Sequence, residues 1–154
     1  MNEAAISEYI TTTFDGVETV TVDDNIFYFY GPEHMFPFAT LMTNDDNDSA
    51  SELNRPGIFR LNIGVDKATF HALLGGSLPA PADDAAAAEA VDFTVLDQVL
   101  PHPVYGRMFW VCILNPSATT FASAIQPLLT EAYDKAVVRE TRRLARGESG
   151  RSQG

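Results

Sequence analysis

Apolar residues at regular spacing predict a helix at the start of the chain and four strands behind it. Ile6, Ile10 and Phe14 recur at the spacing of one helical face, which predicts a helix over residues 2–14. Runs that alternate apolar with polar residues, or are rich in β-branched and aromatic ones, predict strands. These runs cover residues 17–22, 26–30, 38–43 and 58–65. An Asp-Asp-Asn turn separates the first two, so we expect a hairpin.

The middle of the chain predicts a helix, an insertion and a second short helix. Asp66 is suited to be an N-cap, and Phe70, Leu73 and Leu74 would form the buried stripe of the helix that follows. The Pro-, Asp- and Ala-rich residues 77–90 indicate a flexible insertion. We expect a short helix over residues 93–100.

The last third of the chain predicts a strand and a long helix. Residues 108–114 are almost wholly apolar, which is typical of a strand in the interior of a sheet. The helix would start at about residue 120 or 123 and run to residue 144, with Pro127 in its first turns. A disordered polar tail of residues 146–154 would follow.

This order of elements predicts a single α+β domain over residues 1–145. Short turns between consecutive strands favour a mostly antiparallel sheet, with the helices largely on one face. We expect the 58–65 and 108–114 strands in the same sheet. The C-terminal helix, through Leu128 and Leu129, would pack on the face that holds Phe59 and Leu61, beside the N-terminal helix.

The charge of the chain narrows the classes of partner. The net charge is −11; residues 1–100 hold 17 acidic and three basic side chains, and residues 101–154 hold four acidic and seven basic ones. An acidic body repels phosphate backbones, which argues against nucleic acid as the partner. Cys112, the single cysteine, cannot form an intrachain disulfide and fits a reducing cytoplasm. A basic-apolar leader and a membrane-spanning stretch are both absent, so we expect a cytoplasmic protein with no membrane partner.

Two groups of polar residues are candidates for one ligand-binding groove. Arg60 and Asn62 share one side of an otherwise apolar strand, where buried polar groups need partners. His102 and Tyr105 lie in a segment that two prolines stiffen. The alternatives are a salt bridge with a surface hydrogen bond for the first pair, and a rigid turn for the second. Standard catalytic and metal-binding motifs are missing, so no catalytic residue, metal or cofactor is predicted.

A second candidate surface is basic. Arg139, Arg142, Arg143 and Arg146 recur at helical spacing near the end of the long helix. Cations there suit the helix dipole, so a solvated basic face is one interpretation. The other is a patch that binds nucleic acid or an acidic partner.

Three segments resemble a known family: residues 38–40, residues 54–64, and residues 101–106 with the Trp-Val-Cys run that follows at 110–112. Over about residues 1–140 the chain resembles an uncharacterised bacterial family, domain of unknown function 6194, common in actinobacteria. The resemblance implies no established activity.

A more remote resemblance bears on the fold. The layout is similar to the MmcQ/YjbR-like family, whose double-wing fold has been proposed to bind DNA. Tyr105, Trp110 and Tyr133 would occupy its aromatic positions, while Gly106-Arg107-Met108 replaces the polar Asn-Lys stretch usual after the tyrosine.

We therefore expect a small binding or interaction module with a polar groove and no chemistry of its own. Its partner would be a small molecule or a protein, and a homodimer is one form that it could take. Two alternatives stay open: a nucleic-acid-binding protein that uses the basic face, and an enzyme that uses His102 for proton transfer.

Overall fold

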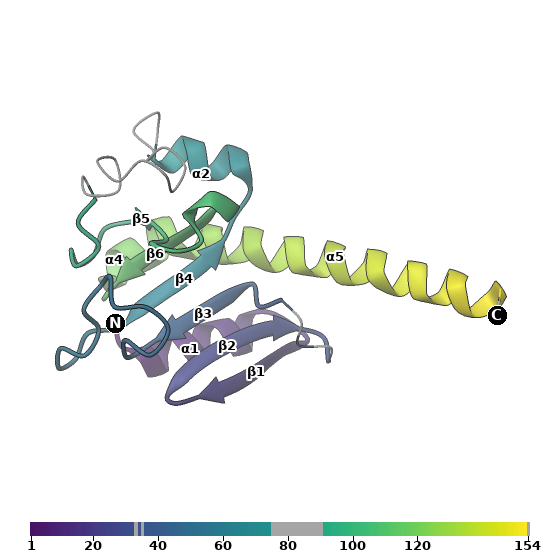
Figure 1. Cartoon of the computed structure of the whole chain (residues 1–154), viewed down its shortest axis with the longest axis horizontal. Helices are drawn as coiled ribbons and strands as arrows, with labels where there is room; N and C mark the ends of the chain where they lie inside the picture. Colours follow the sequence, from purple (N-terminus) through teal and green to yellow (C-terminus); the bar gives the residue numbers. More distant parts are fainter. Residues whose placement is uncertain (33, 35, 75–90, 154) are drawn as a thin grey trace.

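The computed structural model describes residues 1–153 except 33, 35 and 75–90, with side chains up to Arg146. Across these residues, six strands form one sheet in the order β1-β2-β3-β4-β6-β5, and each neighbouring pair is antiparallel (Figure 1). The strands are β1 (Val17–Val22), β2 (Asn25–Tyr30), β3 (Ala39–Met42), β4 (Arg60–Gly64), β5 (Leu100–Pro101) and β6 (Trp110–Leu114). The antiparallel α+β architecture is therefore confirmed.

Helices begin and end the chain. The helical elements are α1 (Glu3–Thr13), α2 (Lys67–Leu74), the 3-10 turn η2 (Gly106–Met108), α4 (Ala118–Thr120), the π-helical segment η3 (Phe121–Ile125) and α5 (Gln126–Gln153). Figure 1 shows α5 extending well beyond the edge of the sheet. The stretch predicted as a disordered tail is mostly the end of this helix.

The core lies between the sheet and the helices α1 and α5. Leu61 of β4 is fully buried in one cluster with Ile6 and Ile10 of α1 and with Leu128 and Leu129 of α5. The predicted packing of both helices on the face of Leu61 is thus confirmed. Burial of this apolar surface stabilises the domain and fixes the sheet face that α5 covers.

The strands predicted at residues 58–65 and 108–114 pair in one sheet, as predicted. β4 and β6 are antiparallel neighbours, and β6 lies in the interior because the short β5 pairs with its other edge. The strand starts at Trp110 rather than at residue 108. Met108 lies in the turn η2 and is 65% exposed, and Phe109 takes a left-handed conformation with φ of 65°. The chain reverses there before it enters the sheet.

Two local predictions differ from the structure, and a third is not tested by it. The helix over residues 93–100 is wrong: the Asp97 N–H donates to the carbonyl of Leu114, and this bond ties the segment to β6 in place of helical bonding. In α2 only Phe70 is buried, and Leu73 is 42% exposed. The insertion predicted at residues 77–90 lies outside the described residues.

The C-terminal helical run starts earlier than predicted. Ser117 caps it at Ala118: its hydroxyl accepts the N–H of Thr120 at 3.1 Å. The wider turn η3 then precedes Pro127, which has no N–H to donate to a preceding carbonyl. Polar Ser and Thr residues at this start do not give the apolar periodicity that marks the rest of the helix.

Candidate functional site

The strand residues that face away from α1 and α5 form a buried polar cluster. Asn62 of β4 lies between its cross-strand partners, Thr40 of β3 and Cys112 of β6. Arg60 lies two residues before Asn62 on the same side of β4. Arg60 and Asn62 are each 1% exposed. Burying a guanidinium is unfavourable unless its charge is paired and its N–H groups donate hydrogen bonds, so the partners of Arg60 determine what this cluster can do.

Arg60 is paired within its own chain. Its Nη1 and Nη2 donate to the two carboxylate oxygens of Asp48, at 2.9 and 2.6 Å. Nη1 also donates to the Ser51 hydroxyl at 3.0 Å, and Nε donates to Asn62 Oδ1 at 2.9 Å. The Asn62 amide in turn donates to the Thr40 hydroxyl at 2.9 Å. Residues 48–51 therefore occupy the space in which a ligand of Arg60 would bind.

The charge of this pair is stable at neutral pH. Burial alone raises the pKa of Asp48, but the hydrogen bonds and the positive charge of Arg60 outweigh it and hold that pKa below its ordinary value. The carboxylate and the guanidinium form a two-point, charge-assisted contact, the strongest class of side-chain hydrogen bond. The loop that carries Asp48 is thereby fastened over β4.

His102 is buried and its ring is fixed by the backbone. Its Nδ1 accepts the N–H groups of Val104 and Tyr105, at 3.0 and 2.9 Å. The pKa of His102 is lowered to about 3, first by burial and then by the positive charge of Arg60, while the charge of Asp48 acts in the opposite sense. A proton on Nδ1 would point at the N–H groups of Val104 and Tyr105, and Nδ1 could then no longer accept their hydrogen bonds. The ring is therefore neutral near pH 7 and serves as an acceptor that shapes the 102–106 turn.

Tyr105 and Cys112 differ in exposure. Tyr105 is 51% exposed, with its ring centroid 5.0 Å from that of His102. Cys112 is 1% exposed, and burial raises the pKa of its thiol to about 12. This confirms the interpretation of Cys112 as a core residue. Of the four predicted groove residues, Arg60 contacts Asn62, and His102 contacts Tyr105. Ligand binding by them stays a prediction that requires residues 48–51 to move.

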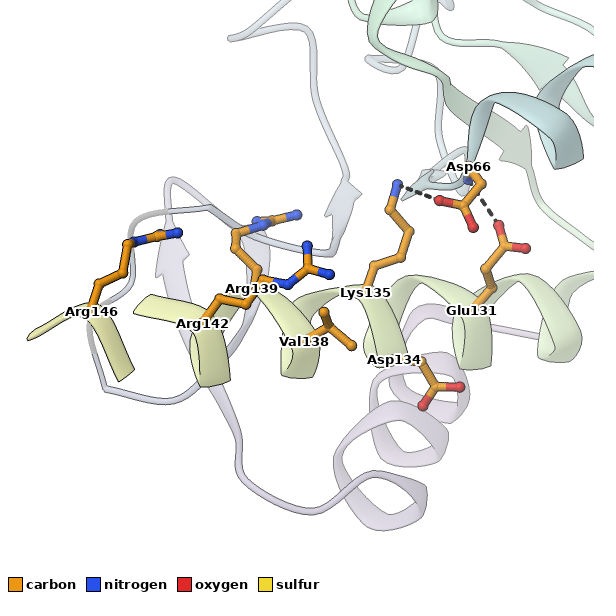
Figure 2. Close-up of a pocket in the computed structure, with 8 residues that line it drawn as sticks. All are labelled: Asp66, Glu131, Asp134, Lys135, Val138, Arg139, Arg142 and Arg146. Atoms are coloured by element: carbon orange, nitrogen blue, oxygen red, sulfur yellow. Dashed lines mark hydrogen bonds and ion pairs between the residues drawn. The ribbon is translucent and has the colours of Figure 1, made fainter. Parts of the chain in front are cut away.

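A second site is open to solvent along α5 (Figure 2). We call it the α5 groove; it has a volume of about 560 Å³. Its lining residues come from α5 and from the residue before α2: Asp66, Glu131, Asp134, Lys135, Val138, Arg139, Arg142 and Arg146. Figure 2 shows the three arginines along one half of the groove and the three carboxylates along the other, with Lys135 between them.

The acidic half of the α5 groove is held by internal contacts. Glu131 accepts the N–H of Asp66 at 3.0 Å and the Thr69 hydroxyl at 2.6 Å. Lys135 donates to the carbonyl of Val65 at 2.8 Å and lies 3.5 Å from the Asp66 carboxylate. These bonds fix α5 against the start of α2 and leave the Asp134 carboxylate exposed.

The basic half of the groove is not neutralised. Within the part of the chain that the structure describes, Arg139, Arg142 and Arg146 form no ion pair with an acidic side chain. Arg139 lies 5.5 Å from the ring centroid of the exposed Phe36, a cation-π distance. Arg143 is different, because it binds Glu140 on the same helix at 2.6 Å. The predicted basic face thus divides into three arginines on the α5 groove and one on the other flank.

Comparison with known proteins places the chain in a family. The model of a family described as "Family of unknown function (DUF6194)" matches residues 1–145. The chain belongs to this family. No curated protein and no solved structure matches it. The resemblance to the MmcQ/YjbR-like family therefore stays a prediction.

Further features of this DUF6194 protein surround α5. A smaller cavity of about 210 Å³ adjoins the α5 groove and is bordered by aromatic residues of β2 and of the loop after it, including Tyr30, His34 and Phe36. Arg139 and Arg146 border both cavities.

Among the described residues, the helices hold no apolar stretch long enough to span a membrane.

Sequence analysis missed the acidic half of the groove. Glu131 and Asp134 precede the arginines on the same helix, so their helical spacing was a usable signal. Asp66 gave no such signal, because it is far from α5 in the sequence and only the tertiary structure brings the two together. The arginines were identified, but their separation from Arg143 depends on the rotation of α5 against the sheet.

Proposed function

We propose that this DUF6194 protein is an interaction module that binds an acidic polypeptide segment in the α5 groove. One observation carries the proposal: three guanidinium groups without acidic partners among the described residues line an open groove, in a chain whose net charge is −11. Elsewhere in the described chain the buried Arg60 has its own carboxylate. Arginines that face solvent along a groove are free to bind carboxylates of another chain.

The chemistry of the groove favours a polypeptide over a long polyanion. Arginine binds carboxylates through paired N–H donors, which gives orientation as well as charge. The carboxylates of Asp66, Glu131 and Asp134 at the other end would repel a phosphate chain that ran the length of the groove. A polypeptide can present acidic side chains to the arginines and a neutral or basic one to Asp134.

The geometry around His102 supports binding without proton transfer. A general acid or base works best with a pKa near the working pH and a free nitrogen facing the substrate. The pKa of His102 is lowered to about 3, and its Nδ1 already accepts two backbone N–H groups. This is the arrangement of a residue that holds a turn in place.

The test is a binding titration, followed by anisotropy, with a fluorescein-labelled peptide of five glutamates and five glycines. Its acidic half can bind the arginines while its neutral half lies beside Asp134. We expect binding that weakens as salt rises, because exposed charges are screened over a Debye length of about 8 Å at 0.15 M. Replacing Arg139 and Arg142 by glutamate should weaken it at least about tenfold, since four units of charge change at the site.

The control is Arg107→Glu, which changes two units of charge, because Arg107 is exposed but lies outside the α5 groove. This variant should bind the peptide like the parent protein. Equal weakening by both variants would show that net charge alone drives binding and would contradict the proposal. Tighter binding of a DNA duplex than of the peptide would replace the acidic polypeptide by nucleic acid as the partner.

A further inference from the structure

The exposed stripe of α5 has opposite charges at its two ends. Glu131 and Asp134 lie towards the start of the stripe, and Arg142 and Arg146 lie towards its end. Val138 separates the two pairs and is 47% exposed, although it is apolar. These positions recur at three- and four-residue spacing, so they follow one side of the helix.

The stripe is complementary to itself when two copies run antiparallel. With Val138 on a two-fold axis, Asp134 and Arg142 each lie four residues away, or about 6 Å along the axis at 1.5 Å per residue. Asp134 of one copy then faces Arg142 of the other, and the reverse contact forms by symmetry. Glu131, seven residues from the axis, comes near Arg146 of the other copy, eight residues away. Its carboxylate already accepts hydrogen bonds from Asp66 and Thr69, so the contacts between Asp134 and Arg142 carry the pairing.

We propose that the occupant of the α5 groove is the α5 helix of a second copy of this chain, packed antiparallel about Val138. This inference rests on the proposed function in that it uses the same groove, and it names the acidic segment as residues 131–134 of the partner copy. A contact that uses the same patch on both copies closes as a dimer and does not extend into a fibre.

The shape and charge of the molecule support this partner. Figure 1 shows the far half of α5 projecting beyond the sheet, where it is open to a second molecule. Two bodies that are each strongly acidic repel one another over most of their surface. The basic end of α5 is the place where the acidic surface of another copy is attracted.

Charge-swap variants test the pairing by sedimentation equilibrium of the full chain. Asp134→Arg places two arginines opposite each other, and Arg142→Asp places two aspartates opposite each other. Each variant alone should dimerise at least about tenfold more weakly than the parent protein, because two attractive contacts become repulsive. An equimolar mixture should form a heterodimer of about parental affinity, since each arginine then faces an aspartate. Arg107→Asp, outside the groove, should dimerise normally.

The outcomes separate this inference from the proposed function. A parent protein that stays monomeric while it binds the glutamate peptide overturns the dimer and leaves the function standing. Single variants that lose the dimer without recovery on mixing overturn the antiparallel register. Recovery on mixing, with each variant as helical by circular dichroism as the parent protein, supports it, because a folding defect in either chain would not be corrected by the other.

Discussion

Asp48→Ala is expected to lower the free energy of unfolding by about 3–5 kcal/mol, the usual cost of removing one partner of a buried ion pair. The Arg60 guanidinium is 1% exposed and binds both carboxylate oxygens of Asp48. Without them, a positive charge remains buried beside the neutral Ser51 and Asn62. Urea denaturation at pH 7, followed by tryptophan fluorescence and circular dichroism, measures the loss.

Two further variants identify the cause of this loss. Asp46→Ala removes an exposed carboxylate from the same loop and should change the free energy of unfolding by less than about 0.5 kcal/mol. Adding Arg60→Met to Asp48→Ala should recover part of the stability, because it removes the unpaired charge. If Asp48→Ala lowered the free energy of unfolding no more than Asp46→Ala, the ion pair of Arg60 and Asp48 would not hold the loop over β4.

His102 is expected to make the protein less stable as the pH falls from about 6.5 to 4.5. Its folded pKa is lowered to about 3 from an ordinary value of 6.5. Between these values the unfolded chain binds a proton on His102 and the folded protein does not. The contribution of His102 to the free energy of unfolding is therefore fully present above about pH 6.5. It is lost as the pH falls towards 3, by up to about 1.4 kcal/mol per pH unit.

The control for this prediction is His102→Asn. The asparagine oxygen can accept the N–H groups of Val104 and Tyr105 but cannot titrate in this range. Between pH 6.5 and 4.5 the parent protein should lose about 2–3 kcal/mol more than this variant in the free energy of unfolding. Parallel pH profiles for the two proteins would contradict the burial of a neutral ring.

The fold was predictable where periodicity and burial agree. β4 has apolar residues at Leu61 and Ile63 alternating with Arg60 and Asn62, and this pattern correctly placed one side against the helices. The segment over residues 93–100 was mistaken for a helix because its apolar residues suit either state. Its bonding to Leu114 is a tertiary effect that local spacing does not encode.

The candidate sites were predictable only in part. The need of Arg60 for a partner follows from its place on an apolar strand, but the loop before it holds several acids and no local signal selects Asp48. The basic face followed from helical spacing. The α5 groove required Asp66, which comes from the start of a different helix, and this juxtaposition depends on the whole fold.

The structure divides the polar residues of the chain into two kinds. Those around Arg60 and His102 satisfy one another and hold loops against the sheet. Those of the α5 groove leave charge exposed on a rigid helix. Because binding energy comes from groups that are not already paired within the chain, we propose that α5 serves recognition and that the buried cluster serves stability.

Amide chemical-shift mapping with the glutamate peptide tests this assignment most directly. The ¹⁵N-labelled protein would be titrated at low salt and the perturbed residues mapped on the structure. We expect the largest shifts on α5 between residues 135 and 146 and on Asp66. Shifts centred on residues 48–62 and 102–105, with α5 unperturbed, would contradict this assignment and would place recognition in the cluster around Arg60.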